Sequence, residues 1–227
     1  NTEQATAVQT PEVHKSEPGG LTSVGDKLFF SGRNSESGSE LWISDGTVTG
    51  TKLVKDIEPG AESSNPLGYQ GGAAFGGELL FSAYFREELW KSGGSEANTI
   101  PIWNPADSGT SEISGIWAGE TVAYIFTNNG LWATTGEVGG QTHLLETEGF
   151  SLDQVMDGDQ IYIVIYSSGE SQLITSTGMP TSTIQLYDGQ IDGLCMLDGL
   201  AYFASGDLVY QSDGTVPSTI PVVTLTG

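Results

Sequence analysis

Positive charge is scarce in this sequence: its 227 residues contain 7 Lys and Arg against 29 Asp and Glu, a formal net charge of −22. Proteins that bind nucleic acid or anionic membranes release counterions from phosphates through clustered Lys and Arg. Seven cations dispersed among 29 anions cannot form such a cluster. The composition therefore argues against nucleic acid and anionic lipid surfaces as partners.

Cysteine, histidine and long apolar runs are also few. No run approaches the roughly 18 apolar residues of a membrane-spanning helix. The one cysteine, Cys195, lies in an apolar run, so no intrachain disulfide can form and we expect a buried thiol. Only His14 and His143 could serve as histidine bases for a nucleophile. The chain begins with Asn1 and shows no leader, which we interpret as a mature exported form after signal-peptide removal.

A repeated pattern runs through most of the chain. Each copy has apolar strand-like segments and a turn whose glycine recurs at Gly46, Gly94, Gly136, Gly178 and Gly214, spaced by 48, 42, 42 and 36 residues. Four short strands in about 42 residues are the blade unit of a β-propeller, which buries its faces by radial packing. We therefore predict an all-β, closed, five-bladed β-propeller with four antiparallel strands per blade. A β-sandwich, the alternative, would not explain the period.

The pattern also divides the chain. The predicted blades cover about 19–58, 67–103, 113–146, 152–187 and 193–226, in a single propeller domain at 19–227. Residues 1–18 lack the pattern and form a predicted extended tail. Because exposed sheet edges accept added strands, we expect this tail to pair with an outer edge or to dock onto another subunit.

Two repeated positions invite a functional interpretation. The third predicted strand carries Trp42, Trp90, Trp132, Ile174 and Tyr210 in register. We expect these side chains to pack between blades, the alternative being a ladder that stacks on a ligand. Asp45 and Asp213 precede turn glycines and are the candidate calcium ligands, although Asp also caps turns through its own backbone. No calcium loop of the D-x-D-x-D-G type occurs, so we expect no cofactor, with calcium as the alternative.

Residues 40–47, Glu-Leu-Trp-Ile-Ser-Asp-Gly-Thr, together with residues 50–51 and 53–60, resemble the ELWxxDGT repeat of bacterial secreted and cell-surface proteins. The second copy keeps Glu88-Leu89-Trp90, and the later copies keep only fragments. The resemblance implies a propeller exported to the periplasm, the cell surface or the medium. It implies no reaction, because a fold does not specify a function.

One face of the predicted propeller carries the least repetitive loops. These are the loops 32–39, 83–87 and 167–172 and the connections 58–67, 103–112, 146–153 and 188–192. Loops on a rigid scaffold commonly carry function. The candidate partner- or ligand-binding residues there are Arg33, Arg86, Tyr84, Phe85, Trp103 and Tyr166. Local ion pairing is the alternative for the arginines, and packing beneath the 104–109 loop is the alternative for Trp103.

These features predict a non-enzymatic accessory subunit that docks onto proteins of an envelope or membrane-bound complex. A lectin-like carbohydrate-binding module is the alternative. A repeat lectin would keep one site in several blades, whereas the long loops here diverge between copies, which favours a protein partner. A glycosidase is the third interpretation, but a carboxylate pair is uninformative among 29 acidic residues.

Overall fold

The computed structural model describes residues 18–68, 71–84 and 87–224, and these residues form five four-stranded antiparallel sheets. We number the sheets 1 to 5 in chain order. Sheet 1 contains β1 (Gly19–Val24), β2 (Lys27–Asn34), β3 (Gly38–Ser44) and β4 (Lys52–Lys55). Sheet 2 contains β5 (Ala73–Phe75), β6 (Glu78–Ala83), β7 (Glu88–Ser92) and β8 (Thr99–Trp103). Sheet 3 contains β9 (Ile113–Ala118), β10 (Ala123–Thr127), β11 (Gly130–Thr134) and β12 (Gln141–Glu146).

Sheet 4 contains β13 (Phe150–Asp157), β14 (Gln160–Ser167), β15 (Glu170–Ser176) and β16 (Ile184–Asp188). Sheet 5 contains β17 (Asp192–Leu197), β18 (Leu200–Ser205), β19 (Leu208–Ser212) and β20 (Ile220–Thr224). The only helices in the described ranges are the short 3-10 turns η1 (Glu96–Asn98), η2 (Pro105–Ser108), η3 (Pro180–Ser182) and η4 (Val216–Ser218). None of them is long and apolar enough to cross a membrane. The predicted all-β fold with four antiparallel strands per repeat is confirmed. The predicted tail at 1–18 lies outside the described residues, except for Pro18.

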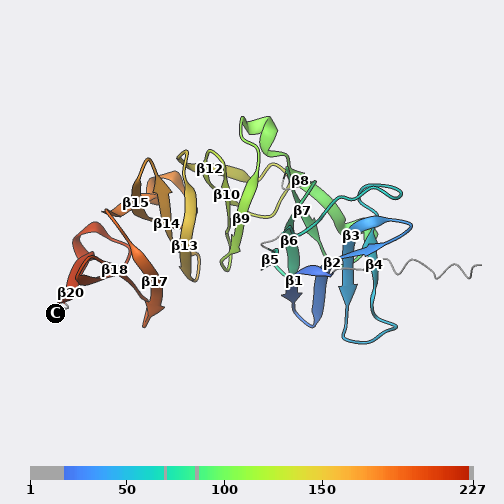
Figure 1. Ribbon diagram of the computed structural model, residues 1–227, viewed down its shortest axis with the longest axis horizontal. Coiled ribbons are helices and arrows are strands. Elements are labelled where there is room, and N and C mark those ends of the chain that lie inside the picture. The colour runs from blue at the N-terminus through green and yellow to red at the C-terminus, as the bar shows by residue number, and fades with distance from the viewer. Residues whose placement is uncertain (1–17, 69–70, 85–86, 225–227) are drawn as a thin grey trace, which may run out of the picture.

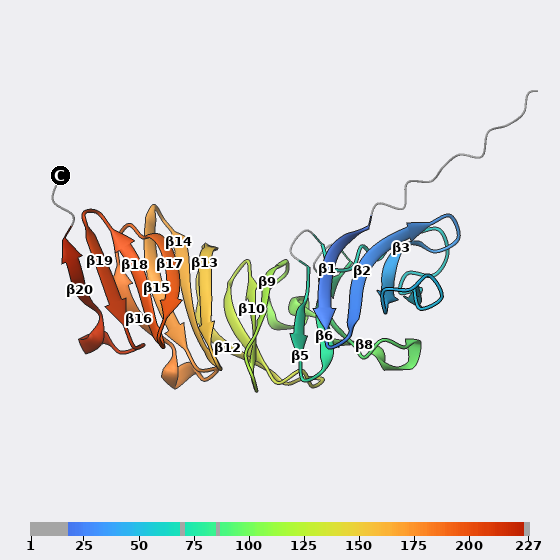
Figure 2. The same cartoon turned by 90° about the horizontal axis from the view of Figure 1, so that it is seen from below.

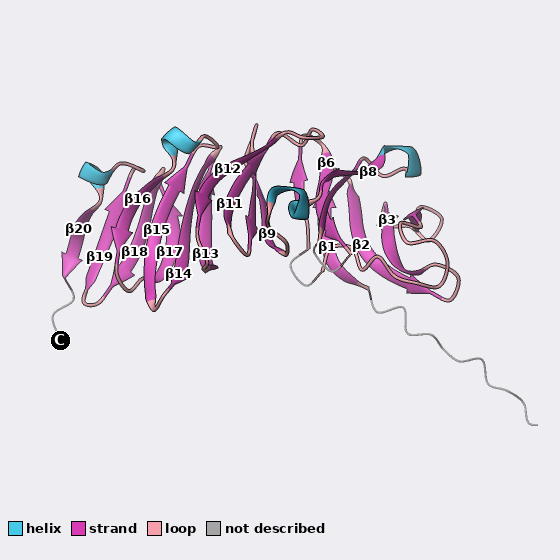
Figure 3. Cartoon of the chain, turned by 90° about the horizontal axis from the view of Figure 1, so that it is seen from above, coloured by secondary structure: helices cyan, strands magenta, loops and turns pink. Residues whose placement is uncertain are grey.

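The sheets stand side by side in an open arc, with sheet 1 and sheet 5 at opposite ends (Figure 1). The first strands of the sheets lie along the concave side, and contacts join β1 to β5, β5 to β9, and β13 to β17 (Figure 1). Views from below and above show the same row of sheets (Figures 2 and 3). Closure of the predicted ring is not seen among the described residues, since sheet 5 lies at the opposite end of the arc from sheet 1 (Figure 1).

Apolar side chains fill each junction between neighbouring sheets. Phe29 and Ile43 of sheet 1 pack with Phe81 and Trp90 of sheet 2 in one such cluster. The other three clusters join sheets 2 and 3, sheets 3 and 4, and sheets 4 and 5. Because strands alternate their side chains between two faces, each internal sheet contributes one face to each neighbour. The core is therefore a series of four similar junctions.

The turns between the third and fourth strands share one hydrogen-bond pattern. The turn glycines named above have φ between 77° and 91°, a conformation that L side chains rarely adopt. Each glycine N–H donates to the Ser or Thr hydroxyl two residues earlier, at 3.1 Å in all five turns. In four sheets that hydroxyl also bonds a Thr seven residues later, as in the Ser92–Thr99 pair at 2.8 Å. These pairs fix the hairpin that the glycine spacing predicts.

Cys195 is exposed on β17, so the expectation of a buried thiol is wrong. Its equivalent in sheet 4 is Val155, which packs against the junction with sheet 5. Sheet 5 has no following sheet among the described residues, and the side of β17 that carries Cys195 therefore remains open.

Candidate functional site

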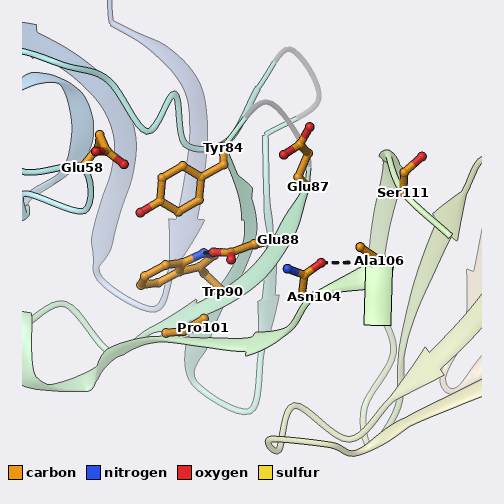
Figure 4. A pocket seen from close by; sticks show the side chains of 9 residues that line it. All are labelled: Glu58, Tyr84, Glu87, Glu88, Trp90, Pro101, Asn104, Ala106 and Ser111. Carbon is orange, nitrogen blue, oxygen red and sulfur yellow. Dashed lines mark hydrogen bonds between the residues drawn. The ribbon is translucent and has the colours of Figure 1, made fainter. Parts of the chain in front are cut away.

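A pocket of about 670 Å³ lies where the loops of sheet 2 meet the connections from sheet 1 and to sheet 3 (Figure 4). Its walls are three carboxylates, two aromatic rings and four smaller residues: Glu58, Glu87, Glu88, Tyr84, Trp90, Pro101, Asn104, Ala106 and Ser111. No Lys or Arg from the described part of the chain lines it. The pocket lies among the non-repetitive loops, on the face that the sequence predicts for function.

Tyr84 is held rigidly at the end of β6. Its backbone has a φ of 52°, and its N–H donates to the Ser64 carbonyl oxygen at 2.6 Å. Its hydroxyl donates to the Ile57 carbonyl oxygen at 3.2 Å. Both partners lie in the connection between sheets 1 and 2, so this connection fixes the orientation of the Tyr84 ring at the pocket wall.

Trp90 and Glu88 line the pocket from β7. The Trp90 indole Nε1–H donates to Glu88 Oε2 at 2.9 Å, and the Tyr84 and Trp90 ring centroids lie 6.2 Å apart. Trp90 is only 6% exposed, and Lys55 Nζ lies 5.9 Å from its ring centroid. Lys55 also donates to the Thr99 carbonyl oxygen at 3.0 Å, which stabilises its position beside the indole. Glu88 is therefore oriented, while Trp90 presents only a small part of its ring.

The electrostatics of the pocket are negative. Burial raises the pKa of the Tyr84 hydroxyl, and the charges of Glu58, Glu88 and Glu40 raise that pKa further. Nearby negative charges oppose ionisation of a phenol, and the same charges attract a cation to the site. Carboxylates pair with guanidinium and ammonium groups through charge-assisted hydrogen bonds, and aromatic rings attract cations over their faces. The arrangement thus suits a positively charged group.

The sequence-predicted binding residues do not all meet at this pocket. Tyr84 lines it. Arg33 is exposed on β2 and is not among the lining residues. Arg86 and Phe85 lie outside the described residues. Tyr166 is half-buried at the end of β14 in sheet 4, where its ring lies 5.3 Å from that of Phe150.

The assignment of Trp103 to binding is corrected by its burial. Its ring is 9% exposed and lies 4.9 Å from the Trp132 ring across the junction of sheets 2 and 3. Its indole Nε1–H donates to Ser108 Oγ at 3.2 Å, in the turn that follows β8. Trp103 therefore packs beneath the 104–109 loop, the alternative that the sequence left open, because the off-pattern ring fills space between two sheets.

The third-strand aromatic residues face the preceding sheet. Trp90, Trp132 and Tyr210 each lie in the cluster shared with the sheet before them. Trp42 occupies the same position in sheet 1, which no sheet precedes among the described residues. It is half-buried and lies 6.5 Å from the Phe30 ring.

The two calcium candidates are engaged in turn hydrogen bonds. Asp45 Oδ1 accepts from the Thr47 N–H at 2.9 Å and from the Thr47 hydroxyl at 2.7 Å. Asp213 Oδ1 accepts from the Thr215 N–H at 2.9 Å and from the hydroxyls of Thr215 and Ser218. These hydrogen bonds lower the pKa of both carboxyls. In the described ranges, no three His, Cys, Asp or Glu side chains gather as metal ligands would.

Glu40 is a residue whose role the sequence analysis missed. It is fully buried, and its carboxylate accepts from the Ile57 N–H at 2.9 Å, the Ser64 N–H at 2.8 Å and the Ser64 hydroxyl at 2.6 Å. Burial raises its pKa, and this effect exceeds the opposing influence of the hydrogen bonds. Glu40 ties the connection after β4 to β3 and so supports Tyr84, which bonds the same connection. Its place at the start of the Glu-Leu-Trp motif was the available signal.

No protein-family model matches the sequence, and no curated protein is detectably similar to it. Solved β-propeller structures are similar in fold. The chain aligns over 92% of its length with 80% of a chain in the crystal structure of a nidogen/laminin complex, at 11% identity and a TM-score of 0.51. It aligns over 89% of its length with 59% of BamB from Moraxella catarrhalis, at 13% identity and a TM-score of 0.56.

A further structure, from a study of two prolyl endopeptidases, aligns with 91% of this chain and 34% of its own length, at 12% identity and a TM-score of 0.56. The five four-stranded sheets thus resemble the blades of a β-propeller, and the fold is all-β and similar to that of solved propellers. At these identities the similarity defines the fold alone, and a fold hosts many functions.

Proposed function

We propose that this protein is a non-enzymatic interaction module, exported from the cytoplasm, whose acidic pocket binds a Lys or Arg side chain of a protein partner. The pocket carries the proposal: three carboxylates flank Tyr84 and Trp90 among loops that differ between sheets. A net charge of −22 adds a long-range attraction for basic partners. The structure in the nidogen/laminin complex is an example of a similar fold in a protein complex.

Export and membership of an envelope complex rest on the resemblance of residues 40–60 to the ELWxxDGT repeat. They are tested by the native mass of the protein in detergent-solubilised envelope from its own source. Migration with a larger complex supports the proposal, whereas a free cytoplasmic protein contradicts it. Removal of residues 1–18 is expected to leave the sheets folded and to weaken this assembly, as the predicted docking tail requires.

The pocket is tested with synthetic peptides. We expect a hexapeptide containing Arg and Lys to bind more tightly than the same peptide with citrulline and norleucine at those positions, in isothermal titration calorimetry at low salt. The double variant Glu87→Gln/Glu88→Gln should abolish the preference, because Gln keeps an acceptor for the Trp90 indole but removes two charges. The control Glu36→Gln/Glu120→Gln, at two exposed positions outside the pocket, changes net charge equally and should retain binding.

The lectin-like module remains the alternative, because Tyr84 and three carboxylates are also groups that sugars contact. A panel of neutral and acidic oligosaccharides, with and without calcium, distinguishes the two. Binding of an oligosaccharide that the Glu87→Gln/Glu88→Gln variant loses, without binding of the basic peptide, would contradict the protein-partner proposal.

A further inference from the structure

The four junctions between sheets follow one rule. The third-strand residues Trp90, Trp132, Ile174 and Tyr210 all pack against the sheet that precedes them in the chain. Residues adjacent along the strands point to the other face and pack against the sheet that follows. In sheet 4, Leu173 next to Ile174, and Tyr162 next to Ile163, pack against sheet 5 in this way. We call the side of a sheet that packs on the following sheet its forward face, and the side that packs on the preceding sheet its backward face. Each junction therefore joins the forward face of one sheet to the backward face of the next, and the two kinds of face are complementary.

One backward face and one forward face have no neighbouring sheet among the described residues. We define the N-terminal end face as the side of sheet 1 with Leu28, Phe30, Trp42 and Leu53, which share this face by register. All four are half-buried side chains, and the Phe30 and Trp42 rings are stacked. The Trp42 indole nitrogen is buried without a hydrogen-bond partner. This face has the composition of an internal junction.

We define the C-terminal end face as the side of sheet 5 with Cys195, Tyr202, Val209 and Val223. Its register equivalents in sheet 4 are buried: Tyr162, matching Tyr202, is 1% exposed, and Leu173, matching Val209, is 0% exposed. In sheet 5 these positions are half-buried, and Val223 is 47% exposed. An apolar sheet face of this kind indicates an interaction surface.

The turn glycines supply an independent observation. A Cβ added at Gly94, Gly136, Gly178 or Gly214 would lie within 3.1 Å of a side chain from the preceding sheet. A Cβ added at Gly46 meets nothing within 4 Å. Sheet 1 thus keeps both the tryptophan and the turn glycine that pack against a preceding sheet elsewhere in the molecule.

We infer that each end face is covered by the opposite end face of a second copy of this chain, so that copies associate head to tail through a fifth junction of the same kind. The two end faces lie at opposite ends of the arc and do not meet within one chain (Figure 1). The partner is a second copy because this chain carries both complementary faces. Such a contact is heterologous: different surfaces of the two copies meet. The inference is independent of the pocket.

Light scattering after size exclusion tests the association. We expect species heavier than the 23.9 kDa chain, because a head-to-tail contact gives a closed ring of copies or a series that grows with protein concentration. These species should be more abundant at higher salt, because the −22 charges repel each other. Val223→Glu, at an exposed position, should shift the species to the monomer mass. Val48→Glu, at a 93% exposed turn residue, is the matched control and should leave them unchanged. A monomer for the unsubstituted chain, or an oligomer unaffected by Val223→Glu, would overturn the inference.

A disulfide tests the head-to-tail orientation. Val155 of sheet 4 and Met196 of sheet 5 lie in one cluster across the junction of these two sheets. By register, Cys195 in sheet 5 occupies the position of Val155, and Ser23 in sheet 1 occupies the position of Met196. The variant Ser23→Cys should therefore crosslink to Cys195 of another copy on oxidation, giving a dimer and larger multimers on a non-reducing gel. Ser23→Cys/Cys195→Ser should give none. A crosslink that persists in this double variant would instead show two copies of sheet 1 face to face and overturn the inference.

Discussion

Sheets 1 and 2 carry the same tripeptide, Glu-Leu-Trp, at the same strand position, but the two copies have different environments. Glu40 is fully buried and accepts three hydrogen bonds from the connection after β4. Glu88 lines a pocket and accepts from Trp90 of its own strand. Trp90 is buried against sheet 1, whereas Trp42 faces an open end. The motif therefore places side chains, and the neighbouring segment decides whether each one stabilises the fold or faces a pocket.

The largest expected difference between the two copies is at the glutamates. Glu40→Ala leaves two N–H groups and one hydroxyl buried without an acceptor, and should lower the free energy of unfolding by about 3 kcal/mol. Glu88→Ala removes one hydrogen bond beside solvent, and should lower it by about 1 kcal/mol or less. Urea unfolding followed by tryptophan fluorescence measures both. Equal losses would show that the motif, and not its surroundings, determines the contribution.

The turn glycines sharpen the comparison at a smaller scale. Gly46→Ala and Gly94→Ala both force a side chain into a φ near 90°, which costs roughly 1–2 kcal/mol. The new Cβ of Gly94→Ala would also lie 2.6 Å from Ile43 Cδ1, and should add about 1 kcal/mol. Thermal unfolding of dilute, monomeric protein should thus rank wild type, Gly46→Ala and Gly94→Ala in that order of decreasing stability. The reverse order of the two variants would contradict the packing of Gly94 on sheet 1.

The smallest expected effect is the pH dependence that Glu40 adds to the stability of the protein. Its pKa is raised in the folded protein, so its contribution to stability is fully present below the ordinary glutamate pKa and decreases as pH rises through the folded pKa. The stability of the wild type relative to Glu40→Gln should therefore decrease from pH 4 to pH 7. Paired urea titrations at the two pH values measure this, and the corresponding Glu88→Gln pair is the control. A relative stability that increased with pH would mean that the three donors, and not burial, dominate the Glu40 pKa.

The sheets could be predicted because their turns recur. The glycines at the turns require a positive φ, and the spacing between them leaves room for only four short strands. The pocket could be predicted only in part. Tyr84 stands out as an aromatic residue in a loop, but Glu58, Glu87 and Glu88 are three among 29 acidic residues. Nothing in the sequence indicates that Glu58 lies near Glu87 and Glu88, because the conformation of the connection that carries Glu58 depends on contacts such as those of Tyr84 with Ile57 and Ser64.

The sequence by itself determined the all-β class, the five repeats and the hairpin turns, because these depend on local φ preferences and on the alternation of side chains along a strand. Only the tertiary structure decided that the sheets form an open arc, that Trp103 packs inside a junction and that Cys195 is exposed. These features depend on the rotation between neighbouring sheets and on whether a further sheet covers a given face. Both arise from packing between residues far apart in the chain, and no local pattern encodes them.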